Sequence, residues 1–384
     1  MKTEFTRLQV DGFRHLRNLD LPLEPLNVLI GANGVGKTSI LEVMGLLASS
    51  ADGRLQESIS SMGGLSSLIT LDHKTPLRIK LERPVEGHAP LEYELFLSIS
   101  ALGYSLPLEC LSQVQKSHKK APFTYIDSQG SDIRYFDVDK QKLLTPTWDH
   151  RPFETSLSQV PKMYREPEQF RQTLASSTLY HALDVSPRAP VRLPQQMRPA
   201  SLPGKDGEDL VSCLYFMRET DRECFEAVED TLRVAFPGFE RLTFPPVAAG
   251  SITMAWKEHH FSQALYAHQL SEGTLRFLWL VTLLQSPHLP TVTMIDEPEV
   301  SLHPEMLMLL AGLLREASSR TLLIVATHSD RFVRFLKPDE LVVCDLDEEG
   351  GTVAMRASTL DLDRWLEDYS LDQLWSMGRL GGRA

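Results

Sequence analysis

The 384-residue sequence lacks any apolar run approaching the roughly 20 residues that a helix needs to cross a bilayer. Residues 1–10 are polar and mixed, without the apolar stretch of a secretory signal. These absences argue against a membrane or secreted protein, so we expect a cytoplasmic protein with no membrane contact. The 42% hydrophobic and 23% charged fractions are those of an ordinary globular protein.

Cysteine is scarce, and its spacing matches no common metal or redox motif. The four cysteines are Cys110, Cys213, Cys224 and Cys344, and none belongs to a C-x-x-C pair. No histidine cluster lies beside them. A structural zinc site or a disulfide framework is therefore disfavoured, and buried free thiols are expected.

Positive charge is also in short supply. The net charge of −12 opposes long-range attraction to nucleic acid. Two local basic groups remain candidates for nucleic-acid contact, the alternative being solvated loops. The first group comprises Arg188, Arg192, Arg198 and Lys205, and the second comprises Lys116, Lys119 and Lys120.

The N-terminal third is rich in strand signals. Residues 26–30 (LNVLI) predict a buried central strand, followed by a glycine-rich loop and a helix over residues 39–48. Residues 5–10 and 19–23 could pair as a hairpin. The stretches at residues 77–105 and 125–138 alternate and indicate an antiparallel sheet.

Helical spacing dominates the middle, over residues 167–174 and 210–236, around a proline- and arginine-rich connection at residues 186–203. Strand-like residues 239–256 follow. No sustained heptads are present, which excludes a long coiled coil.

The last third alternates between helices and apolar strands, which indicates a parallel sheet with helices on its faces. Helices are expected at residues 274–284 and 305–317 and strands at 291–295, 321–326 and 341–346, followed by short terminal helices over 360–377.

The predicted fold class is α/β, with a mixed central sheet, flanking helices, an antiparallel β subdomain and a helical lobe. We interpret residues 1–384 as a single large domain. Its expected parts are an N-terminal lobe (residues 1–154), a helical lobe (155–238) and a C-terminal lobe (239–384).

The most specific motif is G-x-x-x-x-G-K-[ST] at residues 31–38, between an apolar strand and a helix. Its glycines let backbone N–H groups wrap phosphates, and the helix N-terminus adds partial positive charge. Lys37 is expected to reach the β- and γ-phosphates of ATP, and Thr38 to bind Mg²⁺. The predicted nucleotide-binding residues here are Asn33, Gly34, Val35, Gly36, Lys37, Thr38 and Ser39.

Two acids end the apolar strand at residues 291–295, at the sheet edge where α/β proteins bind ligands. Asp296 is placed to hold Mg²⁺, and Glu297 to orient and polarise an attacking water. Alone the pair could be a solvated strand end, but beside the glycine-rich loop it becomes specific.

Two further short motifs are weak signals alone but become more specific through their order along the chain. Ser271 and Gly273 open a helix in L-S-E-G-T, where Ser271 could equally be a simple helix cap. His328, in T-H-S, ends the strand at residues 321–326 and could point at the γ-phosphate, although a lone histidine there is usually structural.

The order of these motifs resembles that of ABC-type ATPase heads, most closely the RecF, SMC and OLD branch. Residues 296–304 resemble the D-E-P-E-x-x-L-H-P stretch of RecF-like AAA-family ATPases. Residues 12–14 (GFR), ahead of the strand and GANGVGKT, resemble the same group. The resemblance spans residues 5–346.

This resemblance implies a homodimer of heads paired head-to-tail around ATP. Ser271 and Gly273 of one subunit would cap the γ-phosphate held by Lys37 of the other. Ser301 would lie in the loop that contacts the opposite subunit, and Arg14 would lie near the nucleotide.

The resemblance also implies roles in catalysis. Glu297 would be the catalytic base, assisted by Lys37 and by His328 as the switch histidine. The family's metal-site glutamine is not obvious here. Gln159 is the best candidate, with Gln129 and Gln141 as alternatives.

The function expected is an ATP-hydrolysing switch in DNA repair or maintenance or in antiphage defence. The alternative is an ATP-dependent sensor or scaffold that holds a separate effector protein with little DNA contact. The 296–304 stretch and the large middle insert argue against a transporter motor. Lys37, Asp296, Glu297 and His328 argue against a catalytically silent module.

Overall fold

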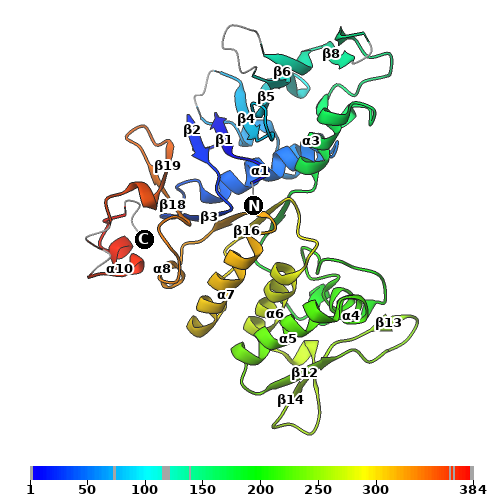
Figure 1. Cartoon of the computed structure of the whole chain (residues 1–384), viewed down its shortest axis with the longest axis vertical. Helices are drawn as coiled ribbons and strands as arrows, with labels where there is room; N and C mark the ends of the chain where they lie inside the picture. The colour runs from blue at the N-terminus through cyan, green and yellow to red at the C-terminus, as the bar shows by residue number, and fades with distance from the viewer. Residues whose placement is uncertain are drawn as a thin grey trace.

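A computed structural model gives the structure of the chain and describes residues 3–71, 75–114, 122–137, 140–362, 365 and 368–380. Three parts extend from a central sheet (Figure 1). An antiparallel arm forms the top of the view, a helical lobe the bottom, and the segments after residue 341 lie at the left. Lys116, Lys119 and Lys120 lie outside the described residues.

The central sheet has six strands in the order β10-β16-β17-β3-β18-β19. Its first five strands are parallel, and only β19 runs antiparallel to its neighbour. The predicted parallel sheet is therefore confirmed, with a mixed edge. The strands are β10 (Thr178–Tyr180), β16 (Val292–Asp296), β17 (Leu322–Ala326), β3 (Leu26–Ile30), β18 (Leu341–Leu346) and β19 (Thr352–Arg356).

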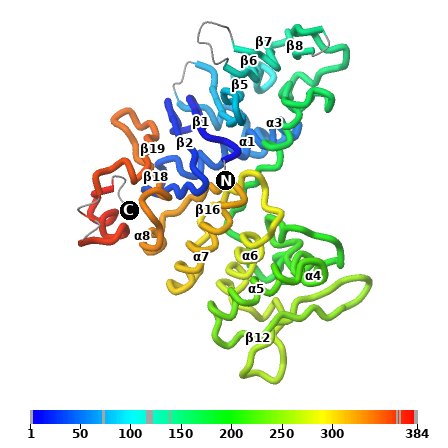
Figure 2. Tube along the Cα trace, viewed as in Figure 1, coloured from blue at the N-terminus to red at the C-terminus, as the bar shows by residue number. Residues whose placement is uncertain are grey.

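Helices cover both faces of this sheet, which explains why β3 and β17 are buried at every position. Val28 packs into the core shared with α6 (Glu272–Gln285) and α7 (Pro304–Ala317), whereas its neighbour Leu29 packs into the core around α1 (Lys37–Ala51). The trace in Figure 2 shows α1 above the sheet and α6 and α7 below it.

The arm is an eight-stranded antiparallel sheet in the order β2-β1-β4-β5-β6-β7-β8-β9. The predicted hairpin of the first two strands is confirmed, with Val10 opposite Leu19. The stretch predicted at residues 125–138 contains two strands, because a turn at Gly130 with φ 60° reverses the chain. The strands are β1 (Arg7–Asp11), β2 (Leu19–Pro22), β4 (Leu77–Arg83), β5 (Leu91–Ser100), β6 (Gly103–Gln113), β7 (Phe123–Gln129), β8 (Asp132–Asp137) and β9 (Lys142–Leu144).

Helix α3 (Arg165–Ala175) packs against α1 in the upper part of the molecule. Its Phe170 is fully buried, and its ring lies 5.8 Å from that of Phe5. The following strand, β10, joins the central sheet. The helical lobe therefore begins after residue 180, later than the boundary expected at residue 155.

The helical lobe combines α4 (Leu210–Thr220), α5 (Arg222–Ala235) and α6 with the sheet β12-β14-β15. The segment predicted as helical over residues 210–236 is two helices. The chain breaks at Asp221, whose carboxylate caps α5 by accepting a hydrogen bond from the Cys224 N–H. The strands are β12 (Phe239–Thr243), β14 (Ala255–Glu258) and β15 (Leu265–Tyr266), beside the short pair β11 (Gln195–Gln196) and β13 (Ser251–Ile252).

The remaining described α-helices are short, and the first of them, α2 (Leu55–Ser61), follows α1. Helix α8 (Asp330–Val333) follows β17, and α10 (Leu371–Ser376) lies near the C-terminus. All four cysteines are free thiols; Cys213 and Cys344 are buried as expected, whereas Cys110 and Cys224 are only partly buried. In the described part of the chain, no helix combines the length and the apolar composition that crossing a membrane requires.

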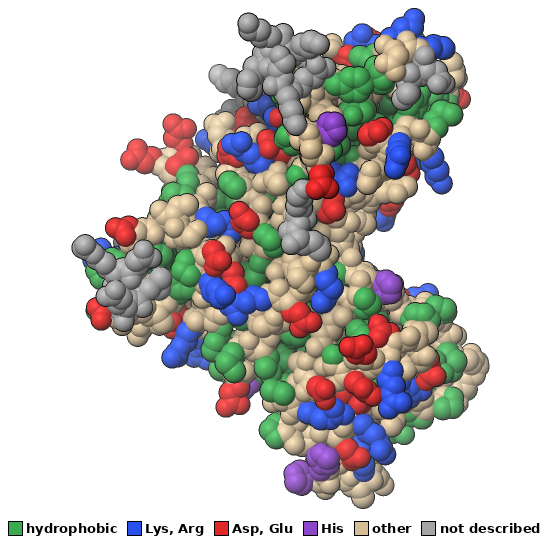
Figure 3. All heavy atoms as spheres, viewed as in Figure 1, with side chains coloured by type: hydrophobic (Ala, Val, Ile, Leu, Met, Phe, Trp, Pro, Cys, Tyr) green, Lys and Arg blue, Asp and Glu red, His purple; other side chains and the backbone are tan. Residues whose placement is uncertain are grey.

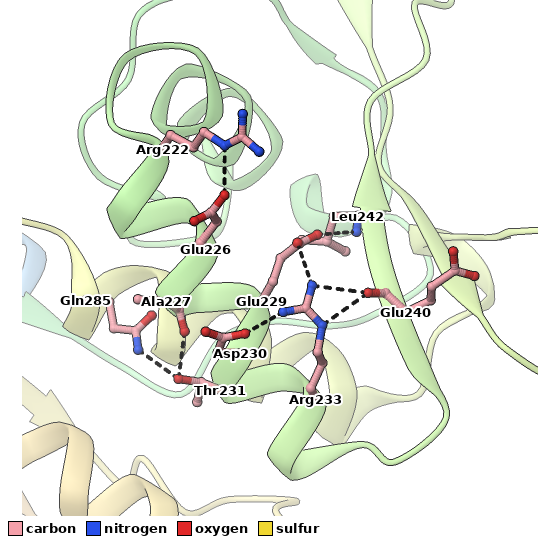
Figure 4. A network of polar contacts seen from close by, with 10 residues as sticks. All are labelled: Arg222, Glu226, Ala227, Glu229, Asp230, Thr231, Arg233, Glu240, Leu242 and Gln285. Carbon is pink, nitrogen blue, oxygen red and sulfur yellow. Dashed lines mark hydrogen bonds and ion pairs between the residues drawn. The ribbon is translucent and has the colours of Figure 1, made fainter.

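Arg233 ties α5 to the first strand of the lobe's small sheet (Figure 4). Its guanidinium pairs with Glu229 and Asp230 on the same helix and donates to the backbone carbonyl of Glu240. Glu229 in turn accepts a hydrogen bond from the Leu242 N–H. One exposed turn of helix is thereby connected to β12.

Replacing Arg233 with alanine should lower the free energy of unfolding by about 1 kcal/mol, because partly exposed charge-assisted bonds are screened by solvent. Urea denaturation followed by circular dichroism measures the change. The control is Arg222→Ala, which removes an 84%-exposed side chain whose partner is Glu226, and it should leave the midpoint unchanged. Equal effects of the two variants would contradict the assignment.

Candidate functional site

The glycine-rich loop connects β3 to α1 and is shaped by backbone conformations that side chains rarely adopt. Gly31 has φ 148° and Gly36 has φ 98°. A Cβ atom at Gly31 would lie 2.2 Å from the carbonyl oxygen of Cys344, and one at Gly36 would lie 2.5 Å from Oγ1 of Thr352. Glycine is therefore required at both positions by conformation and by space.

Lys37 lies folded over this loop. Its Nζ donates to the carbonyl oxygens of Gly31 and Ala32, at 2.7 and 2.9 Å. Burial lowers the pKa of the ammonium group, while the nearby carboxylates of Asp296 and Glu297 oppose that effect. A buried cation that is hydrogen-bonded to these neutral carbonyl groups is well placed to exchange them for anionic oxygens.

The acidic pair lies beside the loop because of strand register. Asp296 on β16 is opposite Ala326 on β17, which is opposite Leu29 on β3. The three parallel strands therefore end in one row, and Oγ1 of Thr38 lies 3.4–3.5 Å from the two carboxylate oxygens of Asp296. A hydroxyl and a carboxylate are oxygen donors of the kind that Mg²⁺ prefers.

Glu297 turns back over the sheet edge in a left-handed conformation, with φ 52°. Such a conformation costs a non-glycine residue of order 1–3 kcal/mol and is concentrated at functional sites. It brings Oε1 of Glu297 to 2.8 Å from Nδ1 of His328. His328 therefore contacts the predicted base and is not among the residues lining the cavity described below.

The buried carboxyl group of Glu299 holds the residue that precedes His328. Thr327 donates its hydroxyl hydrogen to Oε1 of Glu299 and accepts a hydrogen bond from the Ser329 N–H. Burial raises the pKa of Glu299. These bonds fix the backbone on both sides of His328. The sequence reasoning did not identify Glu299 or Thr327 as contributors, although both lie within recognised motifs.

His181 is a second residue that the sequence reasoning missed. It follows β10, the edge strand beside β16, and its Nδ1 lies 3.8 Å from Oδ2 of Asp296. The contact with Asp296 raises the pKa of His181. The only sequence signal was its position after a three-residue strand.

Gln159, the predicted metal-site glutamine, lies elsewhere. Its Oε1 accepts a hydrogen bond from the Arg151 N–H, and its Nε2 donates to the carbonyl oxygen of Thr155. Neither Gln159 nor the alternatives Gln129 and Gln141 line the cavity. The side chain that does lie near Asp296 here is that of His181.

Arg14, which the resemblance predicts to lie near the nucleotide, is one of the residues that line the cavity described below. Its backbone has φ 48°, and its guanidinium pairs with Glu42 of α1 at 2.6 Å. His15 lies beside it. The Val35 side chain is buried away from the cavity, so Val35 can contribute only its backbone N–H.

These residues surround one open cavity of about 330 Å³. That is near the lower end of the roughly 300–1,000 Å³ typical of ligand pockets, and most of the residues that line it are polar or charged. The lining residues are Arg14, His15, Asn33, Gly34, Gly36, Lys37, Thr38, Ser39, Asp296, Glu297 and Ala326.

The residues of the signature turn, defined here as residues 270–274, do not line this cavity. Ser271 caps α6 by accepting a hydrogen bond from the Thr274 N–H at 3.1 Å. Gly273 packs against the backbone of Ser301, where a Cβ atom would lie 2.6 Å from the carbonyl oxygen. Ser271 is therefore a helix cap, the structural role that the sequence also allowed.

The residues lining the cavity suit phosphate groups and a divalent cation. A glycine cradle and a buried ammonium group suit the phosphates, and the juxtaposed Thr38 hydroxyl and Asp296 carboxylate suit the metal. Glu297 also lines the cavity, and His328 contacts its carboxylate.

Comparison with known families gives a match over most of the chain. A family model described as "AAA domain, putative AbiEii toxin, Type IV TA system" matches residues 26–334. That span includes every residue lining the cavity except Arg14 and His15.

Curated relatives match over shorter stretches. An OLD nuclease of Thermus scotoductus is 54% identical over 41 residues, which are 11% of this chain and 8% of that protein. The DNA replication and repair protein RecF of Shewanella sediminis is 29% identical over 115 residues, 28% of this chain and 32% of that one. The chain thus matches a third or less of the length of these relatives.

Solved structures match over nearly the whole chain. An SMC head bound to the C-winged helix domain of ScpA has a TM-score of 0.57 and 14% identity, covering 91% of this chain and 97% of that one. A Pyrococcus furiosus Smc head with an extended coiled coil, bound to the C-terminal domain of ScpA, has a TM-score of 0.51 and 12% identity, covering 95% and 98%. At such identities the similarity concerns the fold alone, and it confirms the predicted fold class.

Gly31→Ala should destabilise the protein by about 3 kcal/mol or more, because the new methyl group must displace the Cys344 backbone as well as adopt a strained φ. Gly34→Ala is the matched control. It has φ 84° but no atom within 4 Å of the added Cβ, so only about 1 kcal/mol of strain is expected. Chemical denaturation measures both, and equal losses would contradict the close contact.

Proposed function

Because the chain belongs to this AAA-domain family and is a RecF/SMC/OLD-like ABC-type ATPase, we propose that it binds Mg-ATP and hydrolyses it to ADP and phosphate. The observation that supports this most is that residues distant in sequence line the same cavity. Lys37, Thr38, Asp296 and Glu297 come from two separate parts of the sequence and line one cavity.

The division of labour among the side chains follows from their chemistry. Bound Mg-ATP would supply the phosphoryl group, with the metal screening its negative charge. Lys37 would release the loop carbonyls and bind phosphate oxygens, while Thr38 and Asp296 would hold the metal. Glu297 would orient a water and accept its proton, and the His328 imidazole would fix the direction of the Glu297 carboxylate.

The proposed active form is a head-to-tail homodimer of single heads. Within one chain the phosphate-binding loop lines the cavity, whereas Ser271 and Gly273 do not. A second copy would present these two residues to the γ-phosphate and exclude water from it, which strengthens electrostatic stabilisation. ATP would close the pair and hydrolysis would release it.

We further propose that the switch serves DNA maintenance or antiphage defence. The similarity to a DNA replication and repair protein, RecF, and to an OLD nuclease supports a role on DNA. The surface chemistry also supports the alternative, in which ATP controls the holding of an effector protein. Arg192 donates to backbone carbonyls, including that of Leu270, and Arg198 pairs with Asp209. In the face drawn in Figure 3, basic and acidic side chains are interspersed.

Glu297→Gln should lower kcat by about 10²–10⁴-fold, because an amide cannot accept the proton of the attacking water. The affinity for ATP should persist, and ATP should convert the variant to a stable dimer. Steady-state phosphate release and light scattering with and without Mg-ATP measure these effects.

The control for the Glu297→Gln experiment is Lys37→Ala, which should abolish both ATP binding and the ATP-dependent dimer. Unchanged turnover in Glu297→Gln would show that another group is the base. Retained ATP affinity in Lys37→Ala would contradict the site as a whole.

Duplex and single-stranded DNA should each be tested for stimulation of phosphate release at two salt concentrations. A DNA-directed switch predicts stimulation that falls steeply as salt rises, because phosphate contacts release counterions. No stimulation and no salt-dependent binding would exclude DNA as the ligand and favour the effector-holding alternative. Recovery of the same stoichiometric protein with wild type, but not with Lys37→Ala, would support that alternative directly.

A further inference from the structure

Arg276 lies one turn into α6, half-buried, and joins two segments that are distant in sequence. Its Nη1 donates to Oγ of Ser301 at 2.7 Å, and its Nε donates to the carbonyl oxygen of Leu183 at 3.2 Å. A guanidinium is a rigid planar fork, so it holds two acceptors in a fixed relation in a way that a flexible ammonium cannot.

One acceptor belongs to the catalytic loop, defined here as residues 297–303 between β16 and α7. Ser301 is exposed and left-handed, with φ 63°, a conformation that local contacts must stabilise. The Arg276 bond holds its side chain, and the tight approach of Gly273 to its carbonyl holds its backbone. The catalytic loop is thus attached to the first turn of α6 by two contacts, one with Arg276 and one with Gly273.

The other acceptor belongs to the segment that follows β10. Leu183 is buried and lies two residues after His181, whose imidazole faces Asp296. A movement of α6 would therefore be transmitted through Arg276 and Leu183 to His181, and from His181 to the carboxylate of Asp296. The same movement would be transmitted through Ser301 along the catalytic loop to Glu297.

We propose that Arg276 is a positioning residue that makes the signature turn, the catalytic loop and residues 181–183 move as one unit. This inference rests on the proposed function, because the signature turn of one subunit would act on the nucleotide held by its partner. Closure on the partner's nucleotide would then orient Glu297 and Asp296 in the same chain's own cavity. The two nucleotide sites of the dimer would be coupled through one side chain.

The test compares Arg276→Ala with wild type in three measurements. The affinity of the monomer for a fluorescent ATP analogue should stay within about twofold, because Arg276 does not line the cavity. The value of kcat should fall about tenfold at nearly unchanged KM, the pattern expected when an interaction orients catalytic groups without binding substrate. Amide hydrogen exchange should accelerate in both the catalytic loop and residues 181–185.

Three further variants separate positioning from general destabilisation. Arg233→Ala removes a more exposed arginine from the same lobe, and it should accelerate exchange only in α5 and β12. Ser301→Ala should free the catalytic loop but leave residues 181–185 protected, since the bond to Leu183 remains. Arg276→Lys, which can satisfy one acceptor at a time, should recover part of the lost kcat.

The outcomes distinguish this inference from the function on which it rests. A wild-type protein that neither binds nor hydrolyses ATP would overturn the proposed function. A hydrolysing wild type with unchanged kcat and exchange in Arg276→Ala would overturn the inference alone. Equal losses of kcat in Arg276→Ala and Arg233→Ala, with equal loss of stability, would also overturn it.

Discussion

The arrangement of the site depends on the parallel register of β3, β17 and β16. Because Leu29, Ala326 and Asp296 share one row, the residues that follow each strand emerge at one edge. The glycine-rich loop, the Thr327–His328 pair and Glu297 are therefore neighbours without direct bonds being needed to assemble them. Slipping any of the three strands by one residue would turn its buried side chains to the other face and separate these groups.

Around that edge, the backbone is held in conformations that are unfavourable in isolation. Glu297, Ser301 and Arg14 are left-handed without being glycine, and all three lie at or near the cavity or the signature turn. Each is stabilised by a specific contact, with His328, Arg276 and Glu42 respectively. The strain is thus concentrated where the orientation of a functional group matters, and the packed cores on both sides of the sheet provide the rigidity that sustains it.

The chain divides its chemistry between two surfaces. The cavity holds the groups suited to phosphate, metal and water, while the signature turn lies outside the cavity lining and forms a capped helix start. Arg276 and Gly273 connect the second surface to the first through Ser301. This division supports a cycle in which pairing of two copies and catalysis depend on each other, as in the proposed function.

The sequence by itself determined the elements whose signal is local. The apolar run at residues 26–30, the glycine-rich loop and the strand ending in Asp296 could each be identified because periodicity and motif spacing depend only on neighbouring residues. The break at Asp221 was missed because a cap competes with helix propensity in a way that spacing does not reveal. Only the tertiary structure decided that His181, not Gln159, lies against Asp296, and that Arg192 and Arg276 bind backbone and loop groups far away in sequence. Those contacts arise from strand order and helix packing, which bring together residues whose sequence separation carries no information about their distance.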